Sequence, residues 1–377
     1  MTELENLLLG QYAEQLAATP QPVGFHDEGD VLTHTLMVHE ALLTIPEFQA
    51  LSLRRQQILE YAALLHDVGK ISATRWQGKE LIAPNHSAIG SRMSRKQLWC
   101  GHNMAGTADT IQFREAVCLL IRYHSFPPHA IDTADGVLKL HRIASNSLLV
   151  PDFSVEMLCI LATADMLGRQ CNDRQQMLDQ IALCAELAKE EVCYTGCYDF
   201  PSAATRQAFF QGRDIWKGQE LHDDTWGEVI LMSGLPGVGK DTYIRNHFPD
   251  IPMISLDDIR AELRVSALDN QGRVANLAKE RAREYLRRHQ SFVWNATNIT
   301  AQNRGRLIRL FEEYGARVRI LYLEAPLDSN MAQNVSRPEA IPGHAILSML
   351  SKLTPPSPTE AHYIEWITTD NTRSSDR

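Results

Sequence analysis

Apolar residues recur at helical spacing through the first half of the chain, and patterns typical of strands are almost absent there. Helix-breaking or helix-capping residues bound several of these segments, such as Thr19-Pro20 after the first and Ser52 before the third. Gly69 is expected to stop the third helix. The pattern predicts an all-α domain with helices near residues 4–17, 31–43, 53–69, 85–98, 111–123, 155–169 and 173–193.

A different pattern begins after residue 225, where short apolar runs alternate with helical segments. Such alternation is typical of an α/β fold with a parallel sheet covered on both faces. The last run, 363–367, is expected to be an edge strand, and residues 73–84 in the first half a loop or short hairpin. We therefore predict an N-terminal domain over 1–200, a linker over 201–225 and a C-terminal domain over 226–377. The expected strands are 229–233, 253–255, 292–294, 318–323 and 363–367.

Composition agrees with two globular domains. The 377 residues are 44% hydrophobic and 22% charged, and no apolar stretch has the length of a membrane span. The first six residues are acidic where a signal peptide is basic, so we expect a cytoplasmic protein. The formal net charge of −9 argues against coating nucleic acid through bulk electrostatics, although a local basic groove is still allowed. Arginines gather at 281–288 and at 304–309, and their spacing on helices allows them to follow a phosphate backbone, although for the first cluster we favour a solvated helix face.

A glycine-rich turn follows the apolar run 229–233 and leads into a helical segment. Such a turn points backbone N–H groups at a phosphate, a lysine reaches the β- and γ-phosphates, and the helix N-terminus adds a positive dipole. The turn departs from the usual pattern at Asp241, where a Ser or Thr normally binds Mg²⁺, with Thr242 one position later. The expected ATP-binding residues are Gly234, Pro236, Gly237, Val238, Gly239, Lys240, Asp241 and Thr242.

Histidines and carboxylates in the first half are of the types that bind divalent metal ions. His34, the adjacent pair His66-Asp67, and Asp165 come from separate predicted helices. Mixed nitrogen and oxygen donors suit Mn²⁺, Co²⁺ or Ni²⁺ better than a thiolate-rich zinc site would. A metal held in this way lowers the pKa of bound water and polarises a phosphoryl oxygen.

These residues resemble the HD-domain metal-dependent phosphohydrolase superfamily, whose pattern is a His, then His-Asp, then a distant Asp on an all-α scaffold. The segments around Lys70, His86 and His124 match a subset with additional histidines. The resemblance implies that His34, His66, Asp67 and Asp165 bind a first metal. It implies that His86 and His124 serve a second metal or the substrate phosphate, and that Lys70 contacts phosphate. Arg169 lies one helical turn after Asp165 and is expected to contact phosphate as well.

In the second half, Asp257 and Arg260 follow the second predicted strand, at the edge where α/β sheets bind ligands. A kinase acting on a hydroxyl needs a carboxylate to accept the proton and a cation for the acceptor phosphate. The arrangement resembles the polynucleotide 5′-kinase branch of P-loop phosphotransferases. That resemblance implies that Asp257 is the general base, that Arg260 holds the acceptor phosphate, and that Arg337 belongs to a lid over ATP. Ala296 departs from it, because that branch has an Asp there.

Together the two halves resemble bacterial bifunctional RNA end-healing enzymes. The resemblance implies hydrolysis of a 2′,3′-cyclic phosphate or 2′-phosphate by the N-terminal domain, with one or two ions such as Mn²⁺, Ni²⁺ or Co²⁺. It implies phosphorylation of 5′-OH ends of RNA or DNA by the C-terminal domain with ATP and Mg²⁺, and a functional link to an RNA ligase. Two alternatives are open at this stage. One is a nucleotide-metabolism enzyme that joins an HD hydrolase to a small-molecule kinase, and the other is an ATP-binding module that regulates the HD domain.

Overall fold

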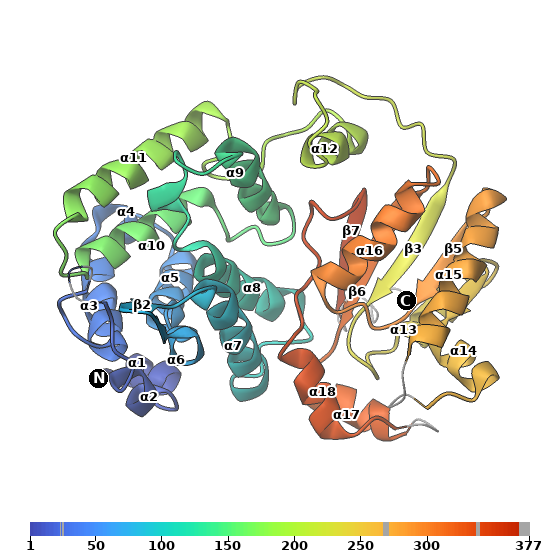
Figure 1. The fold of residues 1–377 in the computed structure, drawn as a ribbon, viewed down its shortest axis with the longest axis horizontal. Coiled ribbons are helices and arrows are strands. Elements are labelled where there is room, and N and C mark those ends of the chain that lie inside the picture. Colours follow the sequence, from blue (N-terminus) through green and yellow to red (C-terminus); the bar gives the residue numbers. More distant parts are fainter. Residues whose placement is uncertain (23, 25, 267–270, 337–339, 369–377) are drawn as a thin grey trace. The chain divides into compact units, whose positions relative to one another are not determined.

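The structure is a computed structural model that describes residues 1–377 except 23, 25, 267–270, 337–339 and 369–377. The chain divides into two compact units, shown in Figure 1. The N-terminal unit comprises residues 1–104 and 109–198, and the C-terminal unit comprises 105–108 and 199–377. In the described part of the chain, no helix is both long enough and apolar enough to cross a bilayer.

The N-terminal unit is helical, as the sequence predicts. Its central helix is α10, which is buried over most of its surface and packs against α3, α5 and α11. An antiparallel hairpin of β1 (Arg75–Gln77) and β2 (Glu80–Ile82) confirms the hairpin interpretation of residues 73–84. The helices are α1 (Glu3–Leu9), α2 (Ala13–Ala17), α3 (Val31–Thr44), α4 (Pro46–Gln49), α5 (Leu53–Leu65), α6 (Lys70–Ala73), α7 (His86–Gly101), α8 (Ala108–Tyr123), η1 (Pro127–His129), α9 (Gly136–Ala144), η2 (Ser145–Leu148), α10 (Val155–Leu167) and α11 (Arg174–Glu190).

Side-chain caps fix where the helices that carry the candidate site begin. The side chain of Asp30 accepts a hydrogen bond from the backbone N–H of Thr33 at the start of α3, and Ser154 does the same at the start of α10. Each cap satisfies a backbone donor that the first helical turn leaves without a partner. The starts of both helices therefore agree with the predicted boundaries.

Gly69 serves a different purpose from the one predicted. Its φ of −66° is right-handed, so it is not a left-handed helix stop. A Cβ on Gly69 would lie 2.1 Å from the carbonyl oxygen of His86 and 2.5 Å from the backbone nitrogen of Gly90. The glycine is required because the turn after α5 touches the first turn of α7. This close approach brings Asp67 and His86 into one site.

Two predictions of helix extent were wrong. The single helix expected over residues 4–17 is interrupted after Leu9, and α1 and α2 are separate. Helix α12 (Ala203–Phe210) lies within the residues predicted to form an irregular connection. Ser202 caps α12 by accepting from the N–H of Thr205, and the rings of Phe200, Phe209 and Phe210 pack together there. Two helical turns are too short for sequence periodicity to reveal.

The C-terminal unit contains a five-stranded parallel sheet with the order β4-β5-β3-β6-β7, which confirms the α/β prediction and the edge position of the last strand. The strands are β3 (Glu228–Ser233), β4 (Met253–Ser255), β5 (Phe292–Asn295), β6 (Arg317–Glu324) and β7 (Tyr363–Thr368). The helices besides α12 are α13 (Lys240–His247), α14 (Leu256–Leu263), α15 (Gly272–Arg287), α16 (Ala301–Glu312), α17 (Leu327–Val335) and α18 (Gly343–Leu350).

Alternate residues of the central strand β3 enter two different cores. Val229 and Leu231 belong to one apolar cluster, and Ile230 and Met232 belong to another. A strand buried on both faces in this way is typical of parallel sheets with helices on each side. The faces of the sheet are thus apolar near β3, and the candidate residues Lys240 and Asp257 follow the carboxyl ends of strands.

A buried ion-pair group joins α7 and α8. Arg95 Nη2 lies 2.7 Å from Glu115 Oε2, and Arg114 Nη2 lies 2.8 Å from Glu115 Oε1. All three side chains are buried. Burial acts to raise the pKa of Glu115, but the two guanidinium groups outweigh it and lower that pKa. One carboxylate therefore compensates two buried cations.

We predict that Glu115→Gln lowers the free energy of unfolding by about 3 kcal/mol, because two buried guanidinium groups lose their counter-charge. Urea denaturation followed by far-ultraviolet circular dichroism measures this change. The matched control is Glu186→Gln, which removes an exposed partner of Lys189 and is expected to change the free energy by less than about 1 kcal/mol. Equal effects of the two substitutions would contradict the prediction.

Candidate functional site

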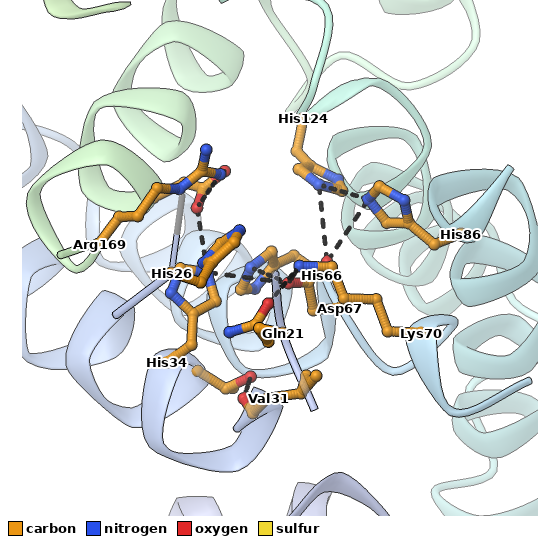
Figure 2. Close-up of polar contacts among 12 residues, drawn as sticks. Gln21, His26, Val31, His34, His66, Asp67, Lys70, His86, His124 and Arg169 are labelled. Atoms are coloured by element: carbon orange, nitrogen blue, oxygen red, sulfur yellow. Dashed lines mark hydrogen bonds and ion pairs between the residues drawn. The ribbon is translucent and has the colours of Figure 1, made fainter. Parts of the chain in front are cut away.

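The four side chains assigned to a first metal meet inside the N-terminal unit. Figure 2 labels three of them, His34, His66 and Asp67. His34 comes from α3, His66 and Asp67 from the turn that follows α5, and Asp165 from α10. His34 Nε2 lies 3.1 Å from Asp165 Oδ1 and 3.7 Å from Asp67 Oδ2. His66 Nε2 lies 3.3 Å from Asp67 Oδ2. Residues far apart in the sequence thus present their ligand atoms to one point.

The two additional histidines face the other oxygen of Asp67. His86 begins α7 and His124 directly follows α8. His86 Nε2 lies 3.5 Å from Asp67 Oδ1, and His124 Nε2 lies 3.9 Å from that oxygen. The two Nε2 atoms are 3.3 Å apart, and Figure 2 draws the two rings joined by a dashed line. Asp67 therefore stands between two groups of histidines, one at each carboxylate oxygen.

Backbone carbonyls set the orientation of three of these rings. The Nδ1 atoms of His66, His86 and His124 lie 2.7, 2.9 and 2.8 Å from the carbonyl oxygens three residues earlier in the chain. A carbonyl only accepts, so each Nδ1 carries the proton. When such a ring is neutral, its Nε2 is the unprotonated nitrogen, and the Nε2 atoms of all three rings face Asp67. This is the tautomer that a metal ligand requires.

The buried nitrogen and oxygen atoms of this cluster are suited to bind divalent metal ions. Among the described residues, the Nε2 atoms of His34 and His66 and the Oδ1 atom of Asp67 are buried without a hydrogen-bond partner. Unsatisfied buried polar atoms are destabilising, and metal coordination would satisfy them. Within the described ranges, three groups have ligand atoms that all lie within 4.8 Å of one another. Two of them include Asp67, namely His34, His66 and Asp67, and Asp67, His86 and His124, and the third is His26, Glu28 and His34.

Two cations hold the carboxylates ionised. Lys70 Nζ lies 2.7 Å from Asp67 Oδ2, and Arg169 Nη2 lies 3.2 Å from Asp165 Oδ1. Burial acts to raise the pKa of Asp67, but Lys70 and His66 outweigh it and hold that pKa well below its usual value. Arg169 does the same for the pKa of Asp165. Both acids are therefore available as anionic ligands.

A pocket of about 200 Å³ opens onto this cluster. Lys70 and Arg169 line it together with Asp67, His86, His124 and Asp165. Six of the eight residues predicted for the N-terminal site thus line one cavity. The other two, His34 and His66, do not line it but contact Asp67.

Sequence reasoning missed three polar residues of this site, all in the segment before α3. Glu28 Oε1 lies 2.9 Å from His34 Nδ1 and 2.7 Å from His26 Nδ1. Burial acts to raise the pKa of Glu28, but the contact with His34 and other hydrogen bonds lower it to about 2. Gln21 accepts a hydrogen bond of 2.6 Å from Lys70 Nζ. Apart from an acid placed shortly before His34, the sequence of this irregular segment gave no signal.

The glycine-rich turn of the C-terminal unit has the backbone of a phosphate-binding loop. Gly234, Gly237 and Gly239 have φ values of 145°, 80° and 90°, a region that other residues rarely adopt. Helix α13 begins directly after them at Lys240. Lys240 Nζ donates to the carbonyls of Gly234 and Leu235 at 3.1 and 2.8 Å, so its ammonium group lies over the loop.

The unusual Asp241 is held by a residue from the neighbouring strand. Asn295, at the end of β5, donates from Nδ2 to Asp241 Oδ1 at 2.6 Å. The pair joins the start of α13 to the strand end at which the resembling kinases carry an Asp near position 296. A carboxylate from the first turn of α13 thus lies beside the strand end where the resembling kinases carry an Asp.

A pocket of about 1020 Å³ surrounds the loop and includes Asp257 and Arg260 from α14. These two side chains form an ion pair, and Arg260 Nε also donates to Gln271 at 3.0 Å. Buried Glu324, at the end of β6, lines the same pocket and accepts from the hydroxyl of Tyr322 at 2.7 Å. Sequence reasoning missed Glu324 because nothing marks it apart from its place after a strand. Arg337 lies outside the described residues.

Three arginines of the two predicted clusters are paired with carboxylates. Arg304 is fully buried and pairs with Glu360 at 2.7 Å, so the expectation that it follows a phosphate backbone was wrong. Arg281 pairs with Glu262 and Arg283 pairs with Glu280, each at 2.5 Å. Carboxylates compensate these cations, which weakens any long-range attraction to nucleic acid.

Comparison with known families assigns a type to each half. Residues 31–149 match the family described as HD domain, and residues 229–356 match the family described as AAA domain. The chain is also 25% identical over 155 residues to L-seryl-tRNA(Sec) kinase of Methanococcus maripaludis. That alignment covers 39% of this chain and 61% of the relative. The two matches cover the parts of the chain that carry the His/Asp cluster and the glycine-rich loop.

We predict that Glu28→Ala lowers the affinity of the protein for Mn²⁺ about 10- to 100-fold, because the ring of His34 loses the carboxylate that orients it. Isothermal titration calorimetry of the full chain without ATP measures this affinity. The matched control is Glu60→Ala, which removes a carboxylate 3.6 Å from His39, outside the cluster, and should leave the affinity unchanged. Unchanged Mn²⁺ binding by Glu28→Ala would show that Glu28 does not support the ligand.

Proposed function

We propose that this protein repairs broken RNA by processing both ends of a break. The N-terminal domain would hydrolyse a 2′,3′-cyclic phosphate or 2′-phosphate, and the C-terminal domain would phosphorylate the 5′-OH of RNA or DNA with ATP and Mg²⁺. The observation that carries the proposal is the presence in one chain of a metal-fitted His/Asp cluster and a phosphate-binding loop that shares its pocket with Asp257 and Arg260. The relative named as a tRNA kinase supports a nucleic-acid-linked acceptor.

In the kinase domain, Asp257 is proposed to accept the proton of the acceptor hydroxyl as that oxygen attacks the γ-phosphorus of ATP. Asp257 is exposed to the pocket, so an acceptor can reach it. Its partner Arg260 would bind the acceptor phosphate. Lys240 and the N-terminus of α13 stabilise negative charge on the transferred group, and Arg337 is proposed to close over ATP.

In the HD domain, His34, His66, Asp67, and Asp165 would hold the first metal ion, and Asp67, His86, and His124 a second. When bound, such ions activate water and polarise the phosphoryl oxygen. The protein itself contributes Lys70 and Arg169, whose cationic groups line the pocket and would bind the non-bridging phosphate oxygens. Gln21 holds the ammonium group of Lys70 in place.

One observation favours a second function, a nucleotide-metabolism enzyme. The kinase pocket of about 1020 Å³ is large enough for ATP and a free nucleoside, so its size does not require a polymer. Comparing kinase rates on a nucleoside and on an oligonucleotide with the same 5′-terminal residue separates the two functions. A higher kcat/KM for the oligonucleotide supports the end-repair proposal, and a preference for the nucleoside supports the alternative.

We predict that Asp257→Ala lowers kcat for 5′-phosphorylation about 100-fold or more, because the acceptor hydroxyl loses its base. Transfer of labelled γ-phosphate from ATP to a 5′-OH oligonucleotide measures kcat. The variant should hydrolyse the 2′,3′-cyclic phosphate end at the wild-type rate. The matched control, Asp258→Ala, removes the neighbouring carboxylate of the same helix and should retain kinase activity.

We predict that Asp67→Ala has the opposite effect on the two activities, with loss of hydrolysis and retention of kinase activity. Loss of the carboxylate common to both candidate metal groups should reduce hydrolysis of the cyclic phosphate to less than about one hundredth of the wild-type rate. Kinase activity on the 5′-OH of the same RNA should be unchanged. Intact mass spectrometry with separate mapping of each end measures both reactions. Full hydrolysis by the variant would remove Asp67 from the proposed site.

A further inference from the structure

An exposed tryptophan stands on the hairpin next to the HD pocket. Trp76 lies in the middle of β1, and 68% of its surface is exposed. The hairpin turns at Gly78, whose φ of 62° allows the tight connection. A large aromatic side chain with so little burial contributes little to a core, so stability does not explain its position.

Strand pairing places Trp76 at the rim of the pocket. Its cross-strand partner is Leu81, and directly opposed residues of an antiparallel pair project from the same face with Cβ atoms about 5 Å apart. Leu81 lines the pocket, as do Ile82 after it and Thr74 at the start of the hairpin. The indole is therefore one side chain away from the cavity that holds Lys70 and Arg169.

The HD pocket is too small to enclose a whole nucleotide, so part of a nucleotide substrate would lie outside it. Pockets that enclose a whole drug-sized molecule are about 300–1,000 Å³. The HD pocket, at about 200 Å³, is smaller than that range. It has room for a phosphate and the ribose that carries it, but the attached nucleobase must project beyond the rim. The hairpin is the rim element that presents an aromatic face.

The charges around Trp76 also suit a nucleotide. Arg75 precedes it in β1, and Lys79 follows the turn. Both are exposed, and neither forms an ion pair with any residue that the structure describes. The hairpin carries a single carboxylate, Glu80, so it has a net positive charge. An aromatic ring flanked by cations is the combination that binds single-stranded nucleic acid.

We propose that the β1–β2 hairpin is a nucleobase-binding subsite, in which Trp76 stacks on the base of the 3′-terminal nucleotide whose ribose phosphate occupies the HD pocket. This inference rests on the proposed phosphohydrolase function. The subsite takes any base, because every base offers an aromatic face and the hairpin directs no buried hydrogen-bonding group at a base edge. The positive charges of Arg75 and Lys79 favour the approach of the negatively charged RNA end to the hairpin.

A double-mutant cycle tests the proposal by pairing removal of the indole with removal of the base. The substrates are a 5′-phosphorylated RNA dinucleotide with a 3′-terminal 2′-phosphate and the same molecule without its terminal base. The 5′-phosphate leaves the kinase domain no acceptor hydroxyl. Wild-type protein and Trp76→Ala are compared in kcat/KM for phosphate release and in the dissociation constant, which is read from fluorescence anisotropy and does not depend on turnover.

We predict that Trp76→Ala weakens binding of the complete dinucleotide and lowers its kcat/KM about 5- to 150-fold, the range that stacking supplies per base, with little change in kcat. On the base-free substrate, the variant and the wild type should be equal. Trp76→Phe should restore most of the loss. Trp216→Ala, which removes a tryptophan that is 71% exposed in the other unit, should change nothing.

Equal losses on both substrates would overturn the stacking proposal and indicate that Trp76 only supports the hairpin. Base-dependent binding without phosphate release would leave the subsite in place and instead contradict the proposed hydrolysis. Phosphate release that is indifferent to Trp76 would preserve the function and reject the subsite. A protein that neither binds nor hydrolyses the complete dinucleotide would exclude both.

Discussion

The N-terminal half of this protein is organised around one buried carboxylate. Asp67 is almost inaccessible to water, and an isolated ionised acid in that position would take up a proton. Lys70 and a ring of histidine nitrogens prevent this by surrounding both oxygens at 2.7 to 3.9 Å. These partners come from different helices, so the charge of Asp67 and the convergence of the helices depend on each other. The absence of a side chain at Gly69 is what allows α7 to come close enough.

Charge compensation is also required in the C-terminal half, where the charged residues lie around an open pocket. The carboxyl ends of parallel strands meet at one edge, and the glycine-rich turn, Asp257 and Glu324 all belong to that edge. Asp241 puts a negative charge beside a loop built for anions, which is unfavourable unless a cation also binds. Its hydrogen bond to Asn295 fixes the carboxylate without neutralising it. We therefore expect Asp241 to help bind the Mg²⁺ that accompanies ATP, in place of the usual hydroxyl.

The sequence predicted those parts of the fold and site that depend on local patterns. Apolar periodicity and capping residues located α3 and α10, and residue type with order along the chain selected His34, His66, Asp67 and Asp165 as a group. Contacts made by irregular segments could not be predicted from the sequence. Glu28 acts through a loop with no periodicity, and Asp241 meets Asn295 across 54 residues. For Gly69, residue identity could not distinguish a left-handed turn from a close approach.

The two pockets differ in volume about fivefold, and under the proposed function the difference follows from the two reactions. A hydrolase acting on a chain end needs to enclose only the phosphate and its sugar, because water is the second reactant. A kinase must hold two large reactants in line, the nucleotide donor and the acceptor end. The smaller pocket leaves the attached base outside it, so under the proposal the hairpin at its rim adds binding without selecting a base. The larger pocket can contact both reactants from its own walls, with Lys240 near the donor and Arg260 near the acceptor.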